Sequence, residues 1–328
     1  MKVGIDVSAA IYGTGVSDYV INLVQNLPQS ELVLFGSSLR RQADISALFP
    51  TAKTFPIPPT LLDIIWNQFH VLAVETLIGP VDILHSSDWT QPPARAKKLT
   101  TIHDLAPFIY PQETSSNIVA AHTRRMKWVV KECDRIICVT NNTASDLLRL
   151  FPSTASRIVV IPEALPARYI SLTPQITKNA NYVFAIGARQ PRKNIDRLKQ
   201  ACAKLGQKLI IVGEGSDLGY VSDQNLVNYL AGASAFVYPS LYEGFGLPIL
   251  EAFHFKVPVA CSNTSSNPEI VGDAAVLFDP LSVDSMAAGI TQAIKDRDQL
   301  VAAGSKQLAK FSWVKTAQQT LGVYNSLI

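Results

Sequence analysis

The sequence has few cysteines and few charged residues, and both shortages narrow the classes of protein that it can encode. None of its four cysteines forms a Cys-x-x-Cys pair, and none has a histidine at metal-ligand spacing. We therefore expect no disulfide framework and no zinc site, and predict buried, reduced thiols. Charged residues make up 17% of the chain and apolar residues 48%, which excludes a disordered chain or a coiled coil.

Long apolar runs are also missing. No stretch reaches the roughly 18 apolar residues that a membrane-spanning helix needs. The first residues, MKVGIDVSAA, have the pattern of a strand and not of a secretion signal. The net charge of +3 is too small to indicate nucleic-acid binding. These absences predict a cytoplasmic protein and remain compatible with peripheral contact at the inner face of a membrane.

Short β-rich runs alternate with helical patterns along the whole chain. The runs include KVGID, ELVLFG, VDILH, LTTIH, RIICVT and RIVVIP, and later YVFAIG, KLIIVG, AFVYP, VPVACS and AVLFDP. Such alternation is typical of doubly wound parallel sheets with helices on both faces. The proline-rich segment 162–174 interrupts the pattern, so the sequence predicts two α/β domains. Residues 284–311 have a helical pattern, and a last helix is expected from Trp313 onward. Ligands of such sheets lie at the carboxyl ends of the strands.

Two candidate site segments follow strands of the first half. Gly13 and Gly15 lie between the strand KVGID and a predicted helix, where glycines let backbone amides approach an anion. A glycine turn without any ligand is the more common meaning of such a pair. His103 directly follows the strand LTTI and could donate a hydrogen bond to a substrate hydroxyl or phosphate. A loop histidine bonded to a carbonyl is equally consistent with this position.

A cluster of cations follows the strand YVFAI in the second half. Arg189, Arg192 and Lys193 lie between the strand end and a predicted helix amino terminus. Positive charges there oppose the helix dipole, which favours a compensating anion. Charge-assisted hydrogen bonds to an anion contribute roughly 1.5–3 kcal/mol each. We therefore favour a diphosphate site over a solvated basic loop. Nearby, Gly213 ends the strand KLIIV and either approaches a nucleotide base or only turns the chain.

The segment 238–253, YPSLYEGFGLPILEAF, places two glutamates around a short apolar turn. Because Pro248 suits a first helical turn, Glu243 is expected before the helix and Glu251 about one turn inside it. The amides of residues 244–247 would then cap the helix and could hold a phosphate or sugar oxygen. Carboxylates accept hydrogen bonds from vicinal hydroxyls, as in a sugar or a ribose. The alternative is that Glu243 caps the helix and Glu251 lies at the surface.

A basic run lies on another predicted helix, and its charge pattern is typical of a solvated face. It comprises Arg124, Arg125, Lys127 and Lys131. Contact with anionic lipid is the second interpretation of this run.

Taken in order, five segments resemble the motifs of retaining glycosyltransferases of family 4. These are YGTGVSDYVINL, TIHDLAPFIYPQ, GARQPRKNIDRL, PSLYEGFGLPILEAF and FSWVKTAQQTL. The resemblance covers nearly the whole chain and is strongest from Tyr182 to Pro280. It implies the α/β GT-B fold, with two facing Rossmann-like, doubly wound parallel-sheet domains. These would be an acceptor-side domain (1–165) and a nucleotide-sugar-binding domain (166–312), with the last helix (313–328) packing back on the first.

The resemblance also implies roles for residues of the second domain. Glu243 would contact hydroxyls of the donor sugar, and Glu251 the ribose hydroxyls. Lys193, with an arginine, would neutralise the diphosphate. Many relatives have that arginine where this chain has Ala188, so Arg189 or Arg192 must substitute. The backbone amides of Phe245, Gly246 and Leu247 would hold the diphosphate and sugar. Gly213 would be the glycine near the base.

In the first domain, the resemblance places His103 near the C6 hydroxyl of the donor sugar. Gly13 and Gly15 would let their loop reach the phosphates. The implied reaction moves a hexose, with mannose or glucose as candidates, from a nucleotide diphosphate sugar to an acceptor hydroxyl with retention of configuration. Polysaccharide or lipid-linked glycan assembly is the expected setting. The alternatives are a sugar-nucleotide epimerase on the same fold and an inactive nucleotide-sugar-binding module.

No metal and no cofactor is expected for this reaction. Cations and backbone dipoles that stabilise the departing diphosphate would supply the main catalytic effect. The expected partners are the nucleotide-sugar donor and a glycan or lipid-linked acceptor, and no feature indicates a particular oligomeric state.

Overall fold

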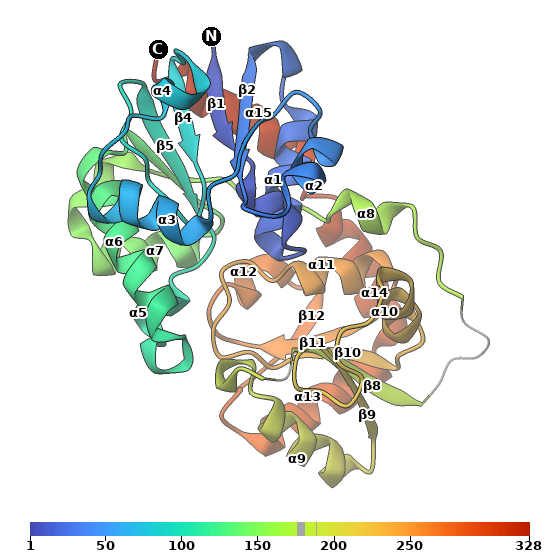
Figure 1. The fold of residues 1–328 in the computed structure, drawn as a ribbon. Coiled ribbons are helices and arrows are strands. Elements are labelled where there is room, and N and C mark those ends of the chain that lie inside the picture. Colours follow the sequence, from blue (N-terminus) through green and yellow to red (C-terminus); the bar gives the residue numbers. More distant parts are fainter. Residues whose placement is uncertain (176–180, 188) are drawn as a thin grey trace. The chain divides into compact units, whose positions relative to one another are not determined.

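The computed structural model describes residues 1–175, 181–187 and 189–328, and Ala188 therefore lies outside the described residues (Figure 1). The chain divides into two compact units. The N-terminal unit comprises Met1–Glu163 and Trp313–Ile328, and the C-terminal unit comprises Ala164–Ser312. Each has its own parallel sheet flanked by helices, which confirms the predicted α/β class.

A seven-stranded parallel sheet forms the centre of the N-terminal unit, in the order β3-β2-β1-β4-β5-β6-β7. Its strands are β1 (Val3–Asp6), β2 (Leu32–Ser37), β3 (Lys53–Phe55), β4 (Ile83–Ser86), β5 (Lys97–Ile102), β6 (Arg135–Cys138) and β7 (Ile158–Val160). The alternating pattern did not reveal β3, because this edge strand has three residues and none is fully buried. From β1, the strands continue through β2 on one side and through β4 on the other, so the strand order reverses between β1 and β4. Ligands of such sheets bind at this switch point.

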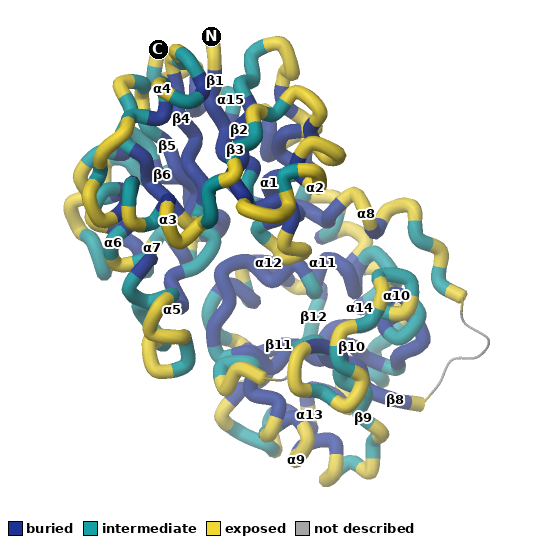
Figure 2. The backbone as a smooth tube through the Cα atoms, in the orientation of Figure 1, coloured by how far each residue is buried: buried dark blue, intermediate teal, exposed yellow. Residues whose placement is uncertain are grey.

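Helices cover this sheet, and those that begin after Thr14, Ser115 and Thr140 are capped by these side chains. They are α1 (Gly15–Asn26), α2 (Gln42–Leu48), α3 (Pro59–Leu62), α4 (Glu75–Ile78), α5 (Ala106–Ile109), α6 (Ser116–Glu132), α7 (Asn141–Leu150) and α15 (Trp313–Asn325). A π-helical turn, η3 (Asp63–Gln68), continues α3, and α15 packs against α1. The central strands β1 and β4 are dark blue in Figure 2, whereas exposed residues concentrate in loops and on outer helices.

The described residues of the C-terminal unit form a five-stranded parallel sheet in the order β12-β11-β10-β8-β9. Its strands are β8 (Tyr182–Ile186), β9 (Lys208–Val212), β10 (Ala235–Tyr238), β11 (Val259–Ser262) and β12 (Ala275–Phe278). Its helices are α8 (Ala167–Ile170), α9 (Ile195–Leu205), α10 (Asp223–Ala231), α11 (Leu247–His254), α12 (Asn267–Val271), α13 (Val283–Lys295) and α14 (Arg297–Leu308). The helical pattern predicted over 284–311 corresponds to α13 and α14, which are separated where the backbone of Asp296 (φ −95°, ψ 24°) leaves the helical conformation.

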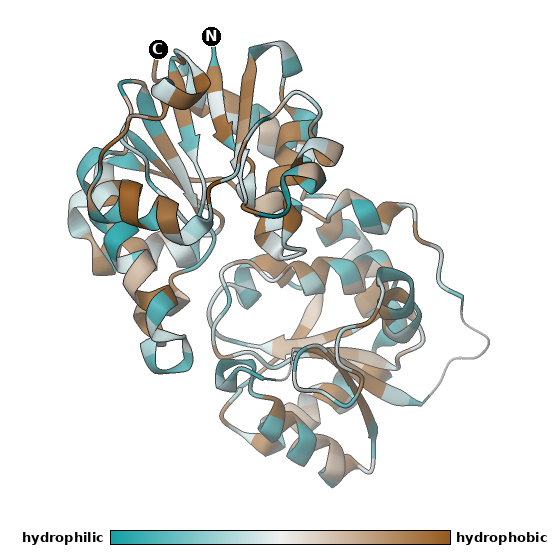
Figure 3. Ribbon diagram, viewed as in Figure 1, coloured by the Kyte–Doolittle hydropathy of each residue, from teal (hydrophilic) through white to brown (hydrophobic). Residues whose placement is uncertain are grey.

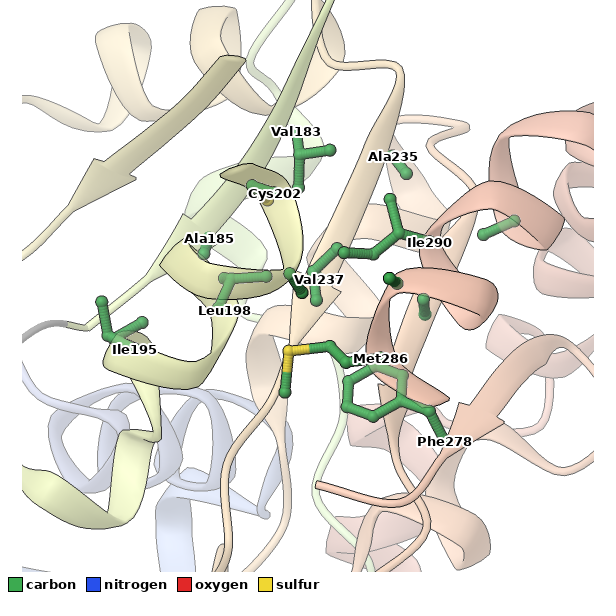
Figure 4. Packing of buried hydrophobic residues seen from close by; sticks show 14 of the residues in the cluster. Val183, Ala185, Ile195, Leu198, Cys202, Ala235, Val237, Phe278, Met286 and Ile290 are labelled. Carbon is green, nitrogen blue, oxygen red and sulfur yellow. The ribbon is translucent and has the colours of Figure 1, made fainter. Parts of the chain in front are cut away.

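The core of the C-terminal unit lies between the sheet and the helices α9 and α13. Val183 and Val237 of the sheet contact Leu198, Met286 and Ile290 of these helices (Figure 4). Removing such side chains from water stabilises the fold by roughly 1.5–3 kcal/mol each. All four cysteines are free and buried, as predicted. Among the described helices, none is long and apolar enough to cross a membrane.

Candidate active site

In the C-terminal unit, a carboxylate and two cations meet beside the carboxyl ends of β8 and β10. Lys193 Nζ donates a hydrogen bond to Glu243 Oε1 at 2.6 Å, and Arg192 Nη1 lies 3.5 Å from Glu243 Oε2. Glu243 is only 8% exposed. Burial raises the pKa of Glu243, but the charges of Lys193 and Arg192 outweigh burial and lower it below its usual value. The sequence suggested that these cations face an external diphosphate, whereas here they contact Glu243.

Tyr238, at the end of β10, connects this cluster to the second glutamate of the motif. Its ring centroid lies 5.4 Å from Lys193 Nζ. Burial raises the pKa of Tyr238 well above its usual value, and the nearby carboxylates of Glu243 and Glu251 raise it further. Glu251 is buried inside α11, so the expectation of a surface glutamate is wrong. Both glutamates and Lys193 therefore lie around one buried phenol.

The loop before α11 is held by two serines from the segment after β11. Ser265 Oγ accepts a hydrogen bond from the amide of Glu243 at 3.0 Å and donates one to its carbonyl at 2.7 Å. Ser266 Oγ is 3.0 Å from the carbonyl oxygens of both Glu243 and Phe245. These contacts fix the backbone that carries the Glu243 carboxylate.

Gly246 occupies the N-cap position of α11, with a φ of +104° that favours glycine. A Cβ there would lie 3.3 Å from Ile249 Cδ1. Leu247 is the first residue of the helix, and Phe245 and Leu247 are both buried. Since the N-cap of this described helix is a glycine without a side-chain hydrogen bond, the expectation that Glu243 caps it is wrong.

The third predicted cation, Arg189, lies apart from this cluster. Its side chain is 71% exposed and forms an ion pair with Glu214. Gly213, before Glu214, ends β9 with a φ of +126°, and the Cβ of Arg189 lies 3.4 Å from the Cβ position of Gly215. The structure thus brings Arg192, and not Arg189, together with Lys193 and Glu243.

In the N-terminal unit, His103 follows β5 and is paired with a carboxylate that sequence reasoning did not single out. His103 Nδ1 lies 2.7 Å from Glu163 Oε1, and both side chains are largely buried. Burial lowers the pKa of His103, but Glu163, with Asp88 and Asp104, raises it above its usual value. The edge of the Tyr19 ring packs on the imidazole at 4.7 Å. Glu163 comes shortly after β7, so the rule that polar residues after strand ends are candidates would have found it.

A buried polar chain lies on the Tyr19 side of His103. Tyr19 Oη, Thr101 Oγ1 and His85 Nε2 are linked at 2.9 Å per step, and His85 Nδ1 lies 2.7 Å from Tyr324 Oη. Burial lowers the pKa of His85 to about 3, so His85 is neutral. Tyr324 belongs to α15, and the last helix is therefore hydrogen-bonded directly to β4.

The glycine turn of the N-terminal unit leads into α1. Gly13 has a φ of +67°, and a Cβ there would meet nothing within 4 Å. Thr14 caps α1 by accepting a hydrogen bond from the Ser17 amide, and Ser17 Oγ accepts one from the Thr14 amide. Gly15 is the first residue of the helix. The turn is thus open on the side of Gly13 and fixed on the side of α1.

One expectation about the basic helix is wrong. Arg125 does not lie on a solvated face, because α6 turns it inward together with Met126 and Val129. Its side chain is 1% exposed, donates a hydrogen bond to Thr100 Oγ1 at 2.6 Å and lies 3.6 Å from Asp88. Its neighbour Arg124 pairs with Asp63.

Among the residues that the structure describes, no group of three or more His, Cys, Asp or Glu side chains is placed to hold a metal ion. The one Asp-x-Asp triplet of the chain, residues 296–298, spans the junction of α13 and α14.

Comparisons with known proteins match both halves of the chain to glycosyltransferases. The family described as Glycosyltransferase Family 4 matches residues 13–167, and the family described as Glycosyl transferases group 1 matches residues 216–308. O-antigen chain mannosyltransferase B of Escherichia coli is 34% identical over 284 residues, 75% of this chain and 74% of that protein. O-antigen chain mannosyltransferase RfbU of Salmonella typhimurium is 26% identical over 273 residues, 76% of this chain and 74% of that protein.

A solved structure shares the fold. HepE of Anabaena, determined in complex with UDP and glucose, superposes with a TM-score of 0.72 at 15% identity, over 99% of this chain and 100% of that chain. This similarity shows the GT-B fold. Together with the 34% identity to the Escherichia coli protein, it identifies the chain as a glycosyltransferase of family 4.

Proposed function

We propose that this enzyme transfers a mannosyl residue from a nucleotide diphosphate sugar to an acceptor hydroxyl, with retention of configuration, during polysaccharide assembly. The cluster of Glu243, Lys193 and Arg192 carries the proposal. Two relatives named as O-antigen chain mannosyltransferases support the sugar and the setting. The HepE complex with UDP and glucose supports a nucleotide-sugar donor.

The ion pair gives this cluster two states. Without donor, Glu243 compensates the charges of Lys193 and Arg192 in a buried setting. A bound diphosphate adds two negative charges, which allows the cations to contact phosphate while the Glu243 carboxylate turns to sugar hydroxyls. Because its lowered pKa keeps Glu243 ionised, the carboxylate accepts hydrogen bonds from two hydroxyls at once. The same cations then stabilise the charge of the departing diphosphate.

The other residues of the C-terminal unit complete the donor site in this proposal. Glu251, buried one turn inside α11, would accept hydrogen bonds from the ribose hydroxyls. Gly213 would leave room for the base. The amides of Phe245, Gly246 and Leu247 would donate to the diphosphate and sugar, since they belong to a helix amino terminus. No step in this scheme requires a metal or a cofactor.

The N-terminal unit would supply His103, with Gly13 and Gly15 in the loop that approaches the phosphates. Glu163 accepts the Nδ1 proton of His103, which leaves Nε2 for the sugar. Because the pKa of His103 is raised, a larger fraction of this imidazole carries a proton that it can donate to the C6 hydroxyl oxygen.

We also propose peripheral contact with an anionic membrane through the segment from α3 to residue 72. This segment exposes Leu61, Ile64, Phe69, Val71 and Leu72. The segment labelled α3 in Figure 1 is among the strongly hydrophobic parts in Figure 3. Beside it, Lys127 and Lys131 of α6 lie over the Trp128 ring. The protein should sediment more with vesicles that contain phosphatidylglycerol than with vesicles of pure phosphatidylcholine. Phe69→Ser should reduce the fraction that sediments with the phosphatidylglycerol vesicles. Equal sedimentation with both would contradict the contact.

The test of the main proposal is a screen of thermal stability against UDP-, GDP-, dTDP- and ADP-sugars, followed by transfer assays with the sugar that binds. A ligand of the native state raises the midpoint of unfolding, and we expect a GDP- or UDP-hexose to do so. Transfer to an acceptor with retained configuration supports the proposal. Epimerised free nucleotide sugar would support the epimerase alternative, and binding without turnover the inactive module.

A further inference from the structure

A large aromatic side chain is exposed to solvent on a loop whose backbone is held by buried hydrogen bonds. Trp89, in the loop after β4, is 41% exposed. Asn67, which is 2% exposed, donates a hydrogen bond to the Trp89 carbonyl at 2.9 Å and accepts one from the Gln91 amide at 2.9 Å. Ser87 Oγ accepts hydrogen bonds from the amides of Trp89 and Thr90. The exposed indole is therefore held in place by the loop that carries it.

Polar groups lie near this indole in the fold and in the sequence. His122 of α6 has its ring centroid 5.4 Å from that of Trp89, with the planes tilted by 55°. The preceding residue, Asp88, is 18% exposed and lies 3.6 Å from Arg125, which is longer than a hydrogen bond. Among the described residues, no hydrogen bond to the Asp88 carboxylate is found. Burial raises the pKa of Asp88, but Arg125, His122 and His103 lower it below its usual value.

Asp88 of this cluster lies near His103, which is proposed to bind the donor sugar. β4 and β5 are neighbours in the sheet, so Asp88 and His103 both follow strands that end at the same edge. The two side chains also line one small cavity, of about 20 Å³, with Asp6, Ser87 and Thr101. A group held by Trp89 and Asp88 would therefore lie within reach of the His103 loop.

We propose that Trp89, Asp88 and His122 form a subsite for one pyranose ring of the acceptor glycan. The flat indole offers an apolar face for the C–H groups of the ring. The ionised Asp88 carboxylate accepts hydrogen bonds from two adjacent hydroxyls, and His122 donates or accepts a third. An apolar surface with a few fixed polar groups is typical of small-molecule sites. The subsite deepens the proposed function, on which its assignment to the acceptor rests.

Tryptophan fluorine NMR tests the subsite without any turnover. The chain has four tryptophans, Trp66, Trp89, Trp128 and Trp313, so 5-fluorotryptophan labelling gives four resonances. The Trp89→Phe variant identifies the resonance of Trp89. Titration with α-1,3-mannobiose should move this resonance in a saturable way while the other three serve as internal controls. Asp88→Asn should weaken the apparent affinity about fivefold or more, which corresponds to about 1 kcal/mol.

The kinetic arm uses the donor and the acceptor that the enzyme accepts. Trp89→Ala should raise the KM for the acceptor about tenfold and leave the binding of the nucleotide sugar unchanged, whereas Trp89→Phe should retain most of the acceptor affinity. A Trp89 resonance that does not move at the solubility limit of the disaccharide would overturn the subsite even if the transferase is active. A shifted resonance in a protein that binds no nucleotide sugar would support the subsite and contradict the proposed function.

Discussion

Lys193 Nζ lies 2.6 Å from Glu243 Oε1 and forms an ion pair with it. In the proposed function, Lys193 binds the diphosphate of the donor and Glu243 binds the sugar. Arg192 completes the pair on the second carboxylate oxygen, at 3.5 Å. Binding of a donor must therefore exchange this internal pairing for contacts with phosphate and sugar. Substitutions of the cations and of Glu243 should therefore affect different steps: the cations affect binding of the diphosphate, and Glu243 affects binding of the sugar.

Replacing Glu243 by Gln should abolish most of the transfer. The isosteric amide keeps the shape of the side chain but replaces one acceptor oxygen by an NH₂ donor and removes the charge, and we expect a fall in kcat of about 10²–10³. The matched control is Glu214→Gln, because Glu214 is also paired with an arginine but is exposed. Steady-state transfer rates at saturating donor check the prediction. A Glu243→Gln variant as active as the control would contradict it.

The two arginines after β8 should have unequal effects. Arg192 shares Glu243 with Lys193, whereas Arg189 pairs with Glu214 at the surface. We therefore expect Arg192→Ala to weaken binding of the nucleotide diphosphate about tenfold or more, as for the loss of a charge-assisted hydrogen bond, and Arg189→Ala to change it little. Isothermal titration calorimetry measures the affinity of both variants for the nucleotide diphosphate. A larger loss in Arg189→Ala would reverse the assignment.

The His103–Glu163 pair should make stability depend on pH. The folded pKa of His103 is raised, so the stabilisation from its charge is fully present below the unfolded pKa of about 6.5 and is lost as pH rises through the folded pKa. In Glu163→Gln the pKa of His103 should fall. Burial and the nearby His85 lower this pKa, and the remaining carboxylates, Asp88 and Asp104, do not replace the effect of Glu163.

The measurement is the midpoint of thermal unfolding of the wild type and Glu163→Gln from pH 5.5 to 8.5. The difference between the two proteins should be largest at the acidic end and shrink as pH rises. The imidazole resonances of His103 should titrate at a lower pH in the variant. A difference that does not vary with pH would mean that Glu163 is structural only.

Tyr324→Phe tests the bond between α15 and β4. The substitution removes the hydroxyl that pairs with a buried imidazole nitrogen, His85 Nδ1, and should cost about 1–3 kcal/mol in the free energy of unfolding. Because His85 is neutral, with a pKa of about 3, this cost should not vary between pH 5.5 and 8. Tyr220→Phe, at an exposed position, is the control. Equal stability of the two variants in urea would refute the predicted role.

The sequence predicted most of the fold because buried strands and amphipathic helices have recognisable patterns of apolar residues. β8 and β10 are continuous apolar runs bounded by turns, and a buried parallel strand requires such a run. The three-residue edge strand β3 has no such pattern. The helical pattern over 284–311 also did not locate the junction at Asp296 between α13 and α14.

The candidate site was predicted where one local motif carries several residues, as in the segment with Glu243 and Glu251. It was missed where the partners come from distant segments. Glu163 meets His103 across 60 residues of sequence, and Arg125 meets Asp88 only because α6 packs on the sheet. Periodicity gives the inward face of a helix, but the sequence alone does not show which buried cation has a carboxylate opposite to it.

The central claim is that Lys193 and Arg192 bind the diphosphate while Glu243 binds only the sugar. Calorimetric titration of the wild type and Glu243→Gln with a nucleotide diphosphate and with the matching nucleotide sugar separates these roles. The account predicts that Glu243→Gln binds the diphosphate as tightly as the wild type or more tightly, since its cations are released, and binds the nucleotide sugar more weakly. Equal affinity of wild type and variant for the nucleotide sugar would contradict it.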